Sequence, residues 1–596
     1  MKRLSILIFS FFNLLIFTTS CQDFFEQESD HIIFADKDHL NNAVDTIYSV
    51  TGIMDKMQLL ADRTILLGEL RGDLVSVTSY ASANVRQIAN FNIDDNNIYN
   101  SPRDYYAVIN NCNYFIAKAD TALKNNRNEY IFMREWAAVK AFRAWTYLQL
   151  ALNYGEVRYV TSPILTKQDA DREEEYPLLN IQQLCLELIN DLKPLVPEYA
   201  AEYPSYGTIG GVDTHLSFFP IYILLGELNL WAGNYREAAL NYYNYINTRN
   251  GTNSYYATGI AAASWGNQQQ TTWDSYSYNT GLYNWTSYTT QGEAITQIAI
   301  SQEYDSVPNP RYNQLRSLFN SRDDNDYHVS ITPSVRLQEI SAWQDYCMVT
   351  GNEGDLSRDT IIVPKGLEHH MDGDLRLRVG WYEVEDYPGK NNERLTTQTI
   401  RKFSTRNVSI WRRQMVYLRM AEALNRAGYP RFAYQILETG VNNQVLKDSV
   451  LSYYCTAADS AFINQFNFPN QLYALEGSGY DATIQGMHSR GSGESRANPH
   501  YRFPTFVTGD TLAQQMDSVE CMILTEGALE FSYEGHRFYD LMRMALRRND
   551  PGFLADRVYA RRGINHAGTV KGEIQADLYD KKNWYLKWNG KLGIGK

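Results

Sequence analysis

The sequence predicts a mostly α-helical protein, a scaffold of antiparallel helix pairs of the tetratricopeptide type that carries a large loop-rich insert. Three observations lead to this prediction: a helix-pair pattern that occurs twice, apolar residues at helical spacing early in the chain, and a central stretch rich in Gly, Asn, Thr and aromatic residues. The chain has 596 residues, of which 44% are hydrophobic and 21% charged, so it can bury a large core.

The helix-pair pattern consists of an aromatic residue, an apolar residue, a small residue, a turn glycine and an alanine at fixed offsets. It comprises Tyr222, Leu225, Gly226, Gly233 and Ala238 in the first copy and, each 195 residues later, Tyr417, Met420, Ala421, Gly428 and Ala433 in the second. The small residues allow two helices to pack closely, and the glycine ends the first helix. Asn229 and Tyr245 depart from the pattern. Because one pair cannot bury its own apolar face, we expect further pairs beside these two.

The first part of the chain supplies the expected neighbours. Apolar residues recur at Leu40, Ala43, Val44, Ile47 and Tyr48, which fits one buried helical stripe. We expect helices over 38–57, 59–73, 105–124 and 130–153, with a polar, Asn-rich loop over 76–100. A further helix is expected over 517–548, followed by a coil-like tail.

These patterns divide the chain into five predicted parts. They are a signal peptide (1–20), a lipidated tether (21–36), an N-terminal helical scaffold (37–249), a loop-rich ligand-facing insert (250–405) and C-terminal helix pairs with a loop insertion (406–596). Long ordered loops on a rigid frame commonly carry binding sites.

The chain begins with the pattern of a secretion signal. Lys2 and Arg3 precede an apolar run from Leu4 to Phe17, which is too short to span a bilayer comfortably. The small residues Thr18, Thr19 and Ser20 then precede Cys21, as in a lipoprotein signal. We expect Cys21 to be lipidated, with acyl chains holding a soluble domain on a membrane. Thr18 stands where leucine is usual, and plain secretion with an incidental cysteine is the alternative.

Charge and cysteine content exclude several classes of protein. The formal net charge of −13 argues against nucleic-acid binding, which depends on neutralising phosphates. It also argues against a strongly anionic ligand, unless a local basic pocket exists. The other cysteines, which are widely spaced and odd in number, predict neither a structural zinc site nor a disulfide scaffold. The 44 tyrosines suit surfaces that recognise polar ligands with flat faces, although helical cores also use tyrosine.

Signatures of catalysis and of metal binding are sparse. The sequence has no G-x-S-x-G, Walker A, H-E-x-x-H or dinucleotide-binding motif, so we expect no cofactor. His369 and His370 precede Asp372 and Asp374, but this cluster fits a solvated loop better than a metal site. The acidic run 323–326 lacks the glycine and distal glutamate of a calcium loop. Carboxylate pairs for glycoside hydrolysis stay possible, because the chain has 68 Asp and Glu residues.

Five blocks in a specific order resemble the SusD/RagB family of outer-membrane nutrient-binding lipoproteins. They are Leu67–Asp73 (LGELRGD), Tyr106–Ile116, Lys140–Leu148 continuing to Tyr154–Val157 (YGEV), Leu418–Asn425 (LRMAEALN) and Glu530–Arg543 (EFSYEGHRFYDLMR). The family usually continues the YGEV block with proline, where this chain has Arg158.

The resemblance implies about four helix pairs of tetratricopeptide type, with a loop-rich insert over one face. It further implies a non-enzymatic, lipid-anchored protein on the cell surface that captures oligosaccharides and delivers them to a TonB-dependent outer-membrane transporter (SusC-like). In some branches of the family the ligand is a peptide. The polar residues of the motifs read as structural: we expect Glu534, Arg537, Asp540, Glu422 and Arg419 to make contacts at helix ends and between helices.

Candidate ligand-binding residues follow from the chemistry of sugars. Sugar rings have apolar faces and hydroxyl groups, so a binding site needs aromatic platforms with Asp, Asn or Arg beside them. We expect such a site to draw on Asp73, Tyr80, Asn84, Arg86, Trp265, Trp273, Trp285 and Trp343. For any single aromatic residue, core packing or contact with the transporter is the competing role.

Three other functions stay open at the level of the sequence. The first is a peptide-binding protein of the same transporter-lid type, which would depend on main-chain hydrogen bonds. The second is a secreted glycan hydrolase on a helical toroid. The third is a purely structural repeat scaffold without a small-ligand pocket.

Overall fold

The structure is a computed structural model of the 596-residue chain. It describes residues 40, 43–200, 203–209, 212–249, 294–300, 314–320, 328–350, 359–363, 373–374, 376–377, 381–388, 394–403, 407–468, 486–493, 495–588 and 592. Most of the predicted insert, together with Cys21, Trp265, Trp273 and Trp285, lies outside the described residues.

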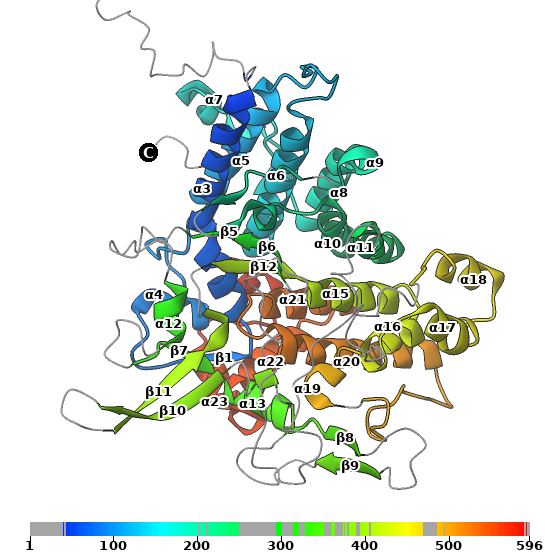
Figure 1. The fold of residues 1–596 in the computed structure, drawn as a ribbon. Coiled ribbons are helices and arrows are strands. Elements are labelled where there is room, and N and C mark those ends of the chain that lie inside the picture. The colour runs from blue at the N-terminus through cyan, green and yellow to red at the C-terminus, as the bar shows by residue number, and fades with distance from the viewer. Residues whose placement is uncertain are drawn as a thin grey trace, which may run out of the picture.

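The architecture is mostly α-helical, as predicted (Figure 1). The main helices are α3 (Ala43–Glu69), α5 (Pro102–Lys118), α6 (Met133–Tyr154), α8 (Ile181–Leu192), α10 (Ile221–Ala232), α11 (Tyr235–Arg249), α15 (Arg413–Arg426), α16 (Pro430–Glu438), α20 (Thr511–Phe531) and α21 (Arg537–Arg548). They form a continuous series in which neighbours pack: α3 on α5, then α6, α8, α10, α11, α15, α16 and α20. Among the described residues, no helix has the length and apolar character needed to cross a membrane.

The two copies of the repeated pattern form the predicted helix pairs, α10–α11 and α15–α16, and they stack directly on each other through α11 and α15. Gly233 and Gly428 have φ angles of 86° and 94°, which glycine adopts readily at a helix end. Gly226 lies so close to the ring of Tyr242 that a Cβ at this position would be 2.7 Å from it. The departure Asn229 is structural, since its side chain accepts a hydrogen bond from the Asn234 side chain at 3.1 Å.

Three predictions of local structure were wrong in detail. The helices expected over 38–57 and 59–73 form one helix, α3. The loop expected over 76–100 contains the strand β1 (Val75–Val77) and the helix α4 (Ala83–Ala89), both too short to show a period. The tail expected to be coil contains α22 (Gly552–Tyr559) and α23 (Ala567–Glu573).

The helix expected over 517–548 is broken into α20 and α21 at 532–536. Tyr533 and Gly535 have φ angles of 71° and 82°, which end a right-handed helix. The break brings Gly535 against α3, where a Cβ on Gly68 would be 1.8 Å from the Gly535 carbonyl oxygen. The backbones therefore cross at a contact that only glycine permits.

Strands occur as two-stranded antiparallel pairs in the described parts of the chain. The pairs are β1 with β7 (Ile331–Pro333), β2 (Val157–Arg158) with β3 (Leu178–Leu179), β4 (Thr208–Ile209) with β5 (Val212–Asp213), β6 (Ala294–Ile298) with β12 (Val408–Arg412), β8 (Tyr346–Thr350) with β9 (Asp359–Val363), and β10 (Trp381–Pro388) with β11 (Arg394–Ile400). Shorter helices complete the described structure: α7 (Lys167–Asp171), α9 (Val196–Tyr199), α12 (Leu315–Phe319), α13 (Val335–Ala342), α17 (Asn443–Val445), α18 (Ala457–Ile463) and α19 (Ser489–Ser492).

A buried network of ion pairs joins α20 to segments that are distant in the sequence. Three glutamates spaced four residues apart each meet a cation: Glu526 pairs with Arg376 at 2.7 Å, Glu530 with Arg412 at 2.5 Å and Glu534 with Lys402 at 2.5 Å. All six side chains are buried. The network therefore fixes parts of the predicted insert to the C-terminal helices.

A second buried network joins α15 to α21. Glu422 pairs with Arg543 at 2.7 Å, and Arg419 pairs with Asp540 at 2.6 Å. These contacts confirm the predicted roles of the family-like motifs between helices, and the ion pair between Glu534 and Lys402 lies at a helix end, as predicted.

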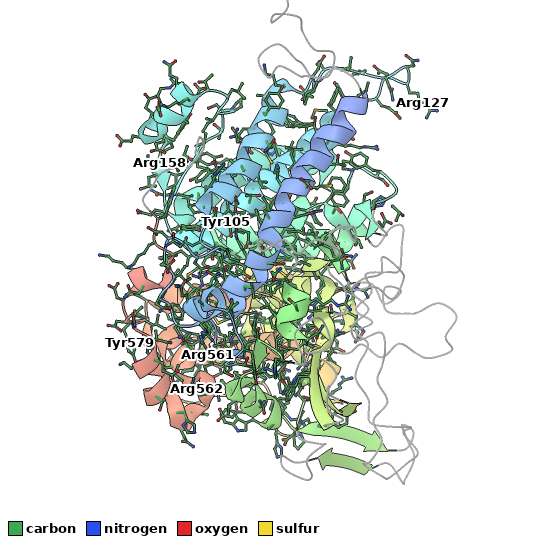
Figure 2. The ribbon with its side chains drawn as sticks, turned by 90° about the vertical axis from the view of Figure 1, so that its left-hand side faces the viewer. Tyr105, Arg127, Arg158, Arg561, Arg562 and Tyr579 are labelled. Carbon is green, nitrogen blue, oxygen red and sulfur yellow. The ribbon has the colours of Figure 1, made fainter. Side chains whose placement is uncertain are left out.

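Arg561 joins the beginning of the chain to its C-terminal part. Its guanidinium donates to the carbonyl oxygens of Leu70, Gly72 and Ala89 at 2.9, 3.0 and 3.0 Å, and so satisfies the ends of α3 and α4. Figure 2 shows Arg561 where the blue N-terminal helix approaches the red C-terminal helices.

A candidate ligand-binding surface

The β1–β7 pair brings together two segments that each carry an exposed aromatic residue. Directly after β1, the amide of Thr78 donates to the Ser330 carbonyl at 3.0 Å, and the Thr78 hydroxyl donates to the Val329 carbonyl at 2.6 Å. Tyr80 lies two residues after Thr78, and His328 lies directly before Val329. The two rings stack with a centroid distance of 3.7 Å and an interplanar angle of 6°.

Tyr80 is 59% exposed, so the stacked pair forms a flat platform at the surface. His328 is exposed as well. A flat aromatic face of this kind can stack against the apolar face of a sugar ring or of another planar group.

Two further candidates lie on α4, directly after Tyr80. Ser82 caps the helix through a hydrogen bond from the Val85 amide at 3.4 Å. Arg86 is exposed, and its guanidinium donates to the Ser79 carbonyl at 3.2 Å, which holds it beside the Tyr80 segment. Asn84 is partly buried, and its carbonyl oxygen accepts from the Asn97 side chain at 3.0 Å. The structure thus places Tyr80, Asn84 and Arg86 on one short stretch of surface.

Trp343 lies on the segment that follows β7 in the chain. It follows α13, whose N-terminal cap Ser334 donates to the Asp73 carbonyl at 2.6 Å and so attaches the helix to the start of β1. Trp343 is 43% exposed, and the Arg336 guanidinium lies over its ring at 4.6 Å from the ring centroid. Trp343 is therefore a second exposed aromatic group, tied to the same strand pair.

Asp73 occupies a different position from the one that the sequence suggests. It is fully buried, and its two carboxylate oxygens accept from Arg537 at 2.6 and 2.9 Å. Burial alone would raise the pKa of Asp73, but the Arg537 guanidinium outweighs it and lowers the pKa below its usual value. We therefore remove Asp73 from the candidate surface and assign it to the joint between α3 and α21.

Sequence reasoning missed His328 and Arg336 at this surface. Neither residue belongs to a local motif, and each meets its aromatic partner only through the β1–β7 pairing and α13. No signal in the sequence pointed to them. Trp265, Trp273 and Trp285 lie outside the described residues and stay predictions.

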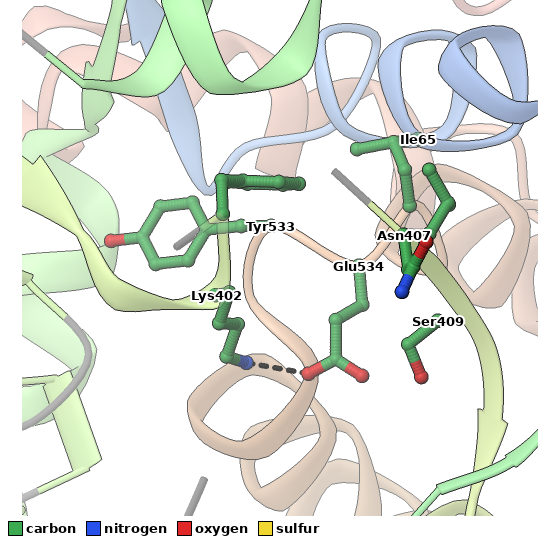
Figure 3. A pocket seen from close by; sticks show the side chains of 8 residues that line it. Ile65, Lys402, Asn407, Ser409, Tyr533 and Glu534 are labelled. Carbon is green, nitrogen blue, oxygen red and sulfur yellow. Dashed lines mark hydrogen bonds and ion pairs between the residues drawn. The ribbon is translucent and has the colours of Figure 1, made fainter. Parts of the chain in front are cut away.

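A small hollow beside the buried network does not serve as a ligand site. Figure 3 shows Lys402 directed at Glu534, with Tyr533, Asn407 and Ser409 around them. The hollow has a volume of about 20 Å³, which is room for a water molecule only. Its two charged groups, Lys402 and Glu534, pair with each other at 2.5 Å, and Asn407 Oδ1 accepts from the Ile300 amide at 3.1 Å.

The described residues contain no group of three or more His, Cys, Asp or Glu arranged to hold a metal ion. Of the sequence cluster around His369, only Asp374 is described, and it pairs with Arg376 at 2.7 Å. The described part of the cluster is thus committed to an ion pair.

Comparisons with known proteins identify the fold. No family model matches the chain, and no curated protein matches its sequence. Among solved structures, it is similar to a SusD superfamily protein from Bacteroides thetaiotaomicron VPI-5482, with a TM-score of 0.52 and 15% identity over 91% of this chain and 95% of that one. A SusD superfamily protein from Bacteroides vulgatus ATCC 8482 gives 0.51 and 13% over 92% and 96%, and B. fragilis NanU gives 0.51 and 14% over 90% and 94%.

Proposed function

We propose, from the premise that this chain has the fold of the SusD superfamily, that it captures oligosaccharides outside the cell and delivers them to a TonB-dependent outer-membrane transporter. The single observation that carries the proposal is the exposed stack of Tyr80 on His328, with the Arg86 guanidinium on the neighbouring helix. The shared fold and the order of the family-like motifs support it.

The chemistry of the surface suits a sugar. An aromatic face covers the apolar face of a pyranose ring, while a guanidinium donates hydrogen bonds to ring and hydroxyl oxygens. Tyr80 offers the aromatic face, and Arg86, on the short helix α4 that follows it, offers the guanidinium. Trp343 offers a further aromatic face for a longer ligand.

The proposal includes the location and the anchor. Cys21 would carry the lipid and hold the protein at the cell outer membrane, with the helical body exposed to the medium. Metabolic labelling with palmitate tests this part: the wild-type chain should be labelled and the Cys21→Ala variant should not.

We propose binding rather than catalysis. Glycoside hydrolysis needs two carboxyl groups that face a substrate. The densest described group of carboxylates, Glu526, Glu530 and Glu534, is buried and neutralised by arginine and lysine. Incubation with glycans should therefore yield no cleavage products.

The first prediction concerns Tyr80. In titration calorimetry against a panel of polysaccharides and oligosaccharides, Tyr80→Ala should weaken glycan binding about two- to tenfold, because ring stacking contributes about 0.5–1.5 kcal/mol. Tyr130→Ala removes an aromatic ring of similar exposure (48% against 59%) from a different surface and serves as the matched control.

Three outcomes would count against the proposal. Absence of binding to every glycan at millimolar concentration would remove the glycan function. Peptides recovered by mass spectrometry from protein purified from its cells would favour the peptide-binding alternative. Equal effects of Tyr80→Ala and Tyr130→Ala would remove Tyr80 from the site.

A further inference from the structure

A cleft of about 580 Å³ lies where the loop after α4 faces the C-terminal segment of the chain. One wall comes from residues 91–95 and the other from residues 575–587, and Arg71 lines the cleft from the end of α3. The volume falls within the range of small-molecule sites, about 300–1,000 Å³. The cleft shares no residue with the Tyr80 surface.

Arg71 is buried beside this cleft, and no carboxylate in the described part of the chain pairs with it. Its guanidinium donates to the Leu67 and Trp584 carbonyl oxygens at 2.7 and 2.8 Å, and to Asn153 Oδ1 at 2.6 Å and the Tyr539 hydroxyl at 3.4 Å. All four acceptors are neutral, and they use four of the five N–H donors. Burial lowers the pKa of Arg71, which reflects a positive charge that no described carboxylate balances.

Two exposed lysines, Lys582 and Lys587, line the same cleft. The cleft also contains two acidic residues. Asp94 already accepts from the Gln87 side chain at 2.7 Å and from the Asn96 amide at 2.8 Å, while Asp95 is exposed. Three cations therefore face two carboxylates, so the lining is locally basic on a chain whose formal net charge is −13.

The walls of the cleft are held in place before any ligand arrives. Trp584 is fully buried, and its indole N–H donates to the Leu578 carbonyl at 2.8 Å. The Leu586 amide donates to the Asn153 carbonyl at 2.8 Å. On the other wall, Phe91 has a φ angle of 54°, unusual for a bulky residue, and packs on the ring of Phe538. A preformed site loses less entropy on binding.

We propose that this cleft is a second ligand-binding site that takes an acidic sugar, with the anionic group of the sugar directed to Arg71, Lys582 and Lys587. The proposal rests on the proposed function and adds a substrate class to it. The −13 charge disfavours anionic ligands except at a local basic pocket, and this cleft is such a pocket.

The mixed lining favours an acidic sugar over a simple inorganic anion. A sugar carries hydroxyl donors as well as its charge, and Asp95, Asn92 and Gln575 offer acceptors for them in the same cleft. The seven-residue helix α4, about 10 Å long, lies in the chain between Tyr80 and the first cleft-lining residue, Phe91.

The test is titration calorimetry with matched glycan pairs, each an acidic oligosaccharide and its uncharged counterpart, such as oligogalacturonides and their methyl esters.

The variants are Lys582→Gln with Lys587→Gln, and a control with the same change in net charge, Lys571→Gln with Lys581→Gln. The control lysines lie on neighbouring segments: Lys571 covers the rings of Tyr559 and Tyr579, and Lys581 binds Asn549. Arg71 is left intact, because its four bonds join α3 to α6, α21 and the C-terminal segment.

We expect the wild-type protein to bind at least one acidic glycan more tightly than its uncharged counterpart, and the preference to fall as salt is raised. The cleft variant should lose about tenfold in affinity for the acidic glycan and keep its affinity for uncharged ligands, while the control keeps both. Uncharged glycans bound as well as acidic ones, or equal effects of the cleft and control variants, would overturn the inference and leave the proposed function standing. Failure of every glycan to bind would overturn both.

Discussion

Single residues in this protein show why residue type alone does not identify a binding site. Asp73 and Tyr80 are close in the sequence and both have side chains that sugars favour, yet Asp73 is buried against Arg537 and Tyr80 is exposed. The sequence could not separate them, because the partner of Asp73, Arg537, lies on α21 and the partner of Tyr80, His328, lies just before β7. The two residues differ in burial, and burial depends on contacts between segments that are far apart in the sequence.

The structural role of Asp73 leads to a prediction at this scale. Asp73→Ala should destabilise the protein by about 3–5 kcal/mol, because it leaves the Arg537 charge buried and unpaired. Urea unfolding measures the loss. Under conditions in which the variant is still folded, its glycan affinity should equal that of the wild type. A loss of glycan affinity with unchanged stability would return Asp73 to the ligand site.

Glu69 supplies a second prediction, on pH. Burial raises its pKa from 4.5 to about 7, and its Oε1 accepts from the Gly535 amide at 2.9 Å. Because the folded state holds this proton more tightly than the unfolded state, its contribution to stability is complete below pH 4.5 and is lost as the pH rises through about 7. The Glu69→Gln side chain stays neutral at every pH. The difference in free energy of unfolding between Glu69→Gln and the wild type should therefore shift by about 3 kcal/mol in favour of the variant from pH 4 to pH 8. Urea unfolding of both proteins at the two pH values checks this, and a pH-independent difference would contradict it.

At the scale of elements, the sequence predicted the features that depend on contacts between helices adjacent in the chain. The helix pairs α10–α11 and α15–α16 followed from small residues and glycines at fixed offsets, since these residues serve the contact between adjacent helices. The break at 532–536 and the β1–β7 pair could not be predicted in the same way. Each depends on a distant partner: Gly535 on α3, and Val77 on Ile331.

The close contact within α10–α11 leads to the prediction for this scale. Gly226→Ala should destabilise the protein by about 1–3 kcal/mol, because the added methyl group meets the ring of Tyr242 at 2.7 Å. Gly52→Ala is the matched control in an exposed position of α3, where a Cβ meets nothing within 4 Å. It should stabilise the protein by about 0.5–1 kcal/mol through helix propensity. Thermal unfolding of both variants tests the pair, and opposite signs are the expected result.

At the scale of the whole molecule, the fold class was predictable and the means of holding the parts together was not. The motif residues Glu422, Glu534 and Asp540 were expected to make interhelix contacts, and they do. The partners of Glu422 and Asp540, Arg543 and Arg419, belong to the motifs as well. The partners of Glu534, Arg412 and Lys402, carry no motif, because they come from segments outside the helical repeat. The network around Glu526, Glu530 and Glu534 therefore connects the predictable helices to the segments whose sequence shows no period.

These networks predict how the molecule responds to acid. Burial alone would raise the pKa of Glu526, Glu530 and Glu534, but the effect of their cationic partners is larger. These partners lower the pKa of Glu526 and Glu534 to about 2, and they lower the pKa of Glu530 well below its usual value. The stability that these pairs contribute is present above pH 4.5 and is lost as the pH falls toward 2. Between pH 4.5 and 3.5 the unfolded chain binds on average about three quarters of a proton more at each of the three sites, so the free energy of unfolding should fall by about 3 kcal/mol per pH unit. Urea unfolding at pH 4.5, 4 and 3.5 measures the slope. A slope equivalent to less than one proton would show that these carboxylates are not ionised in the folded protein, and the buried networks would then not join the helical scaffold to the insert through charge.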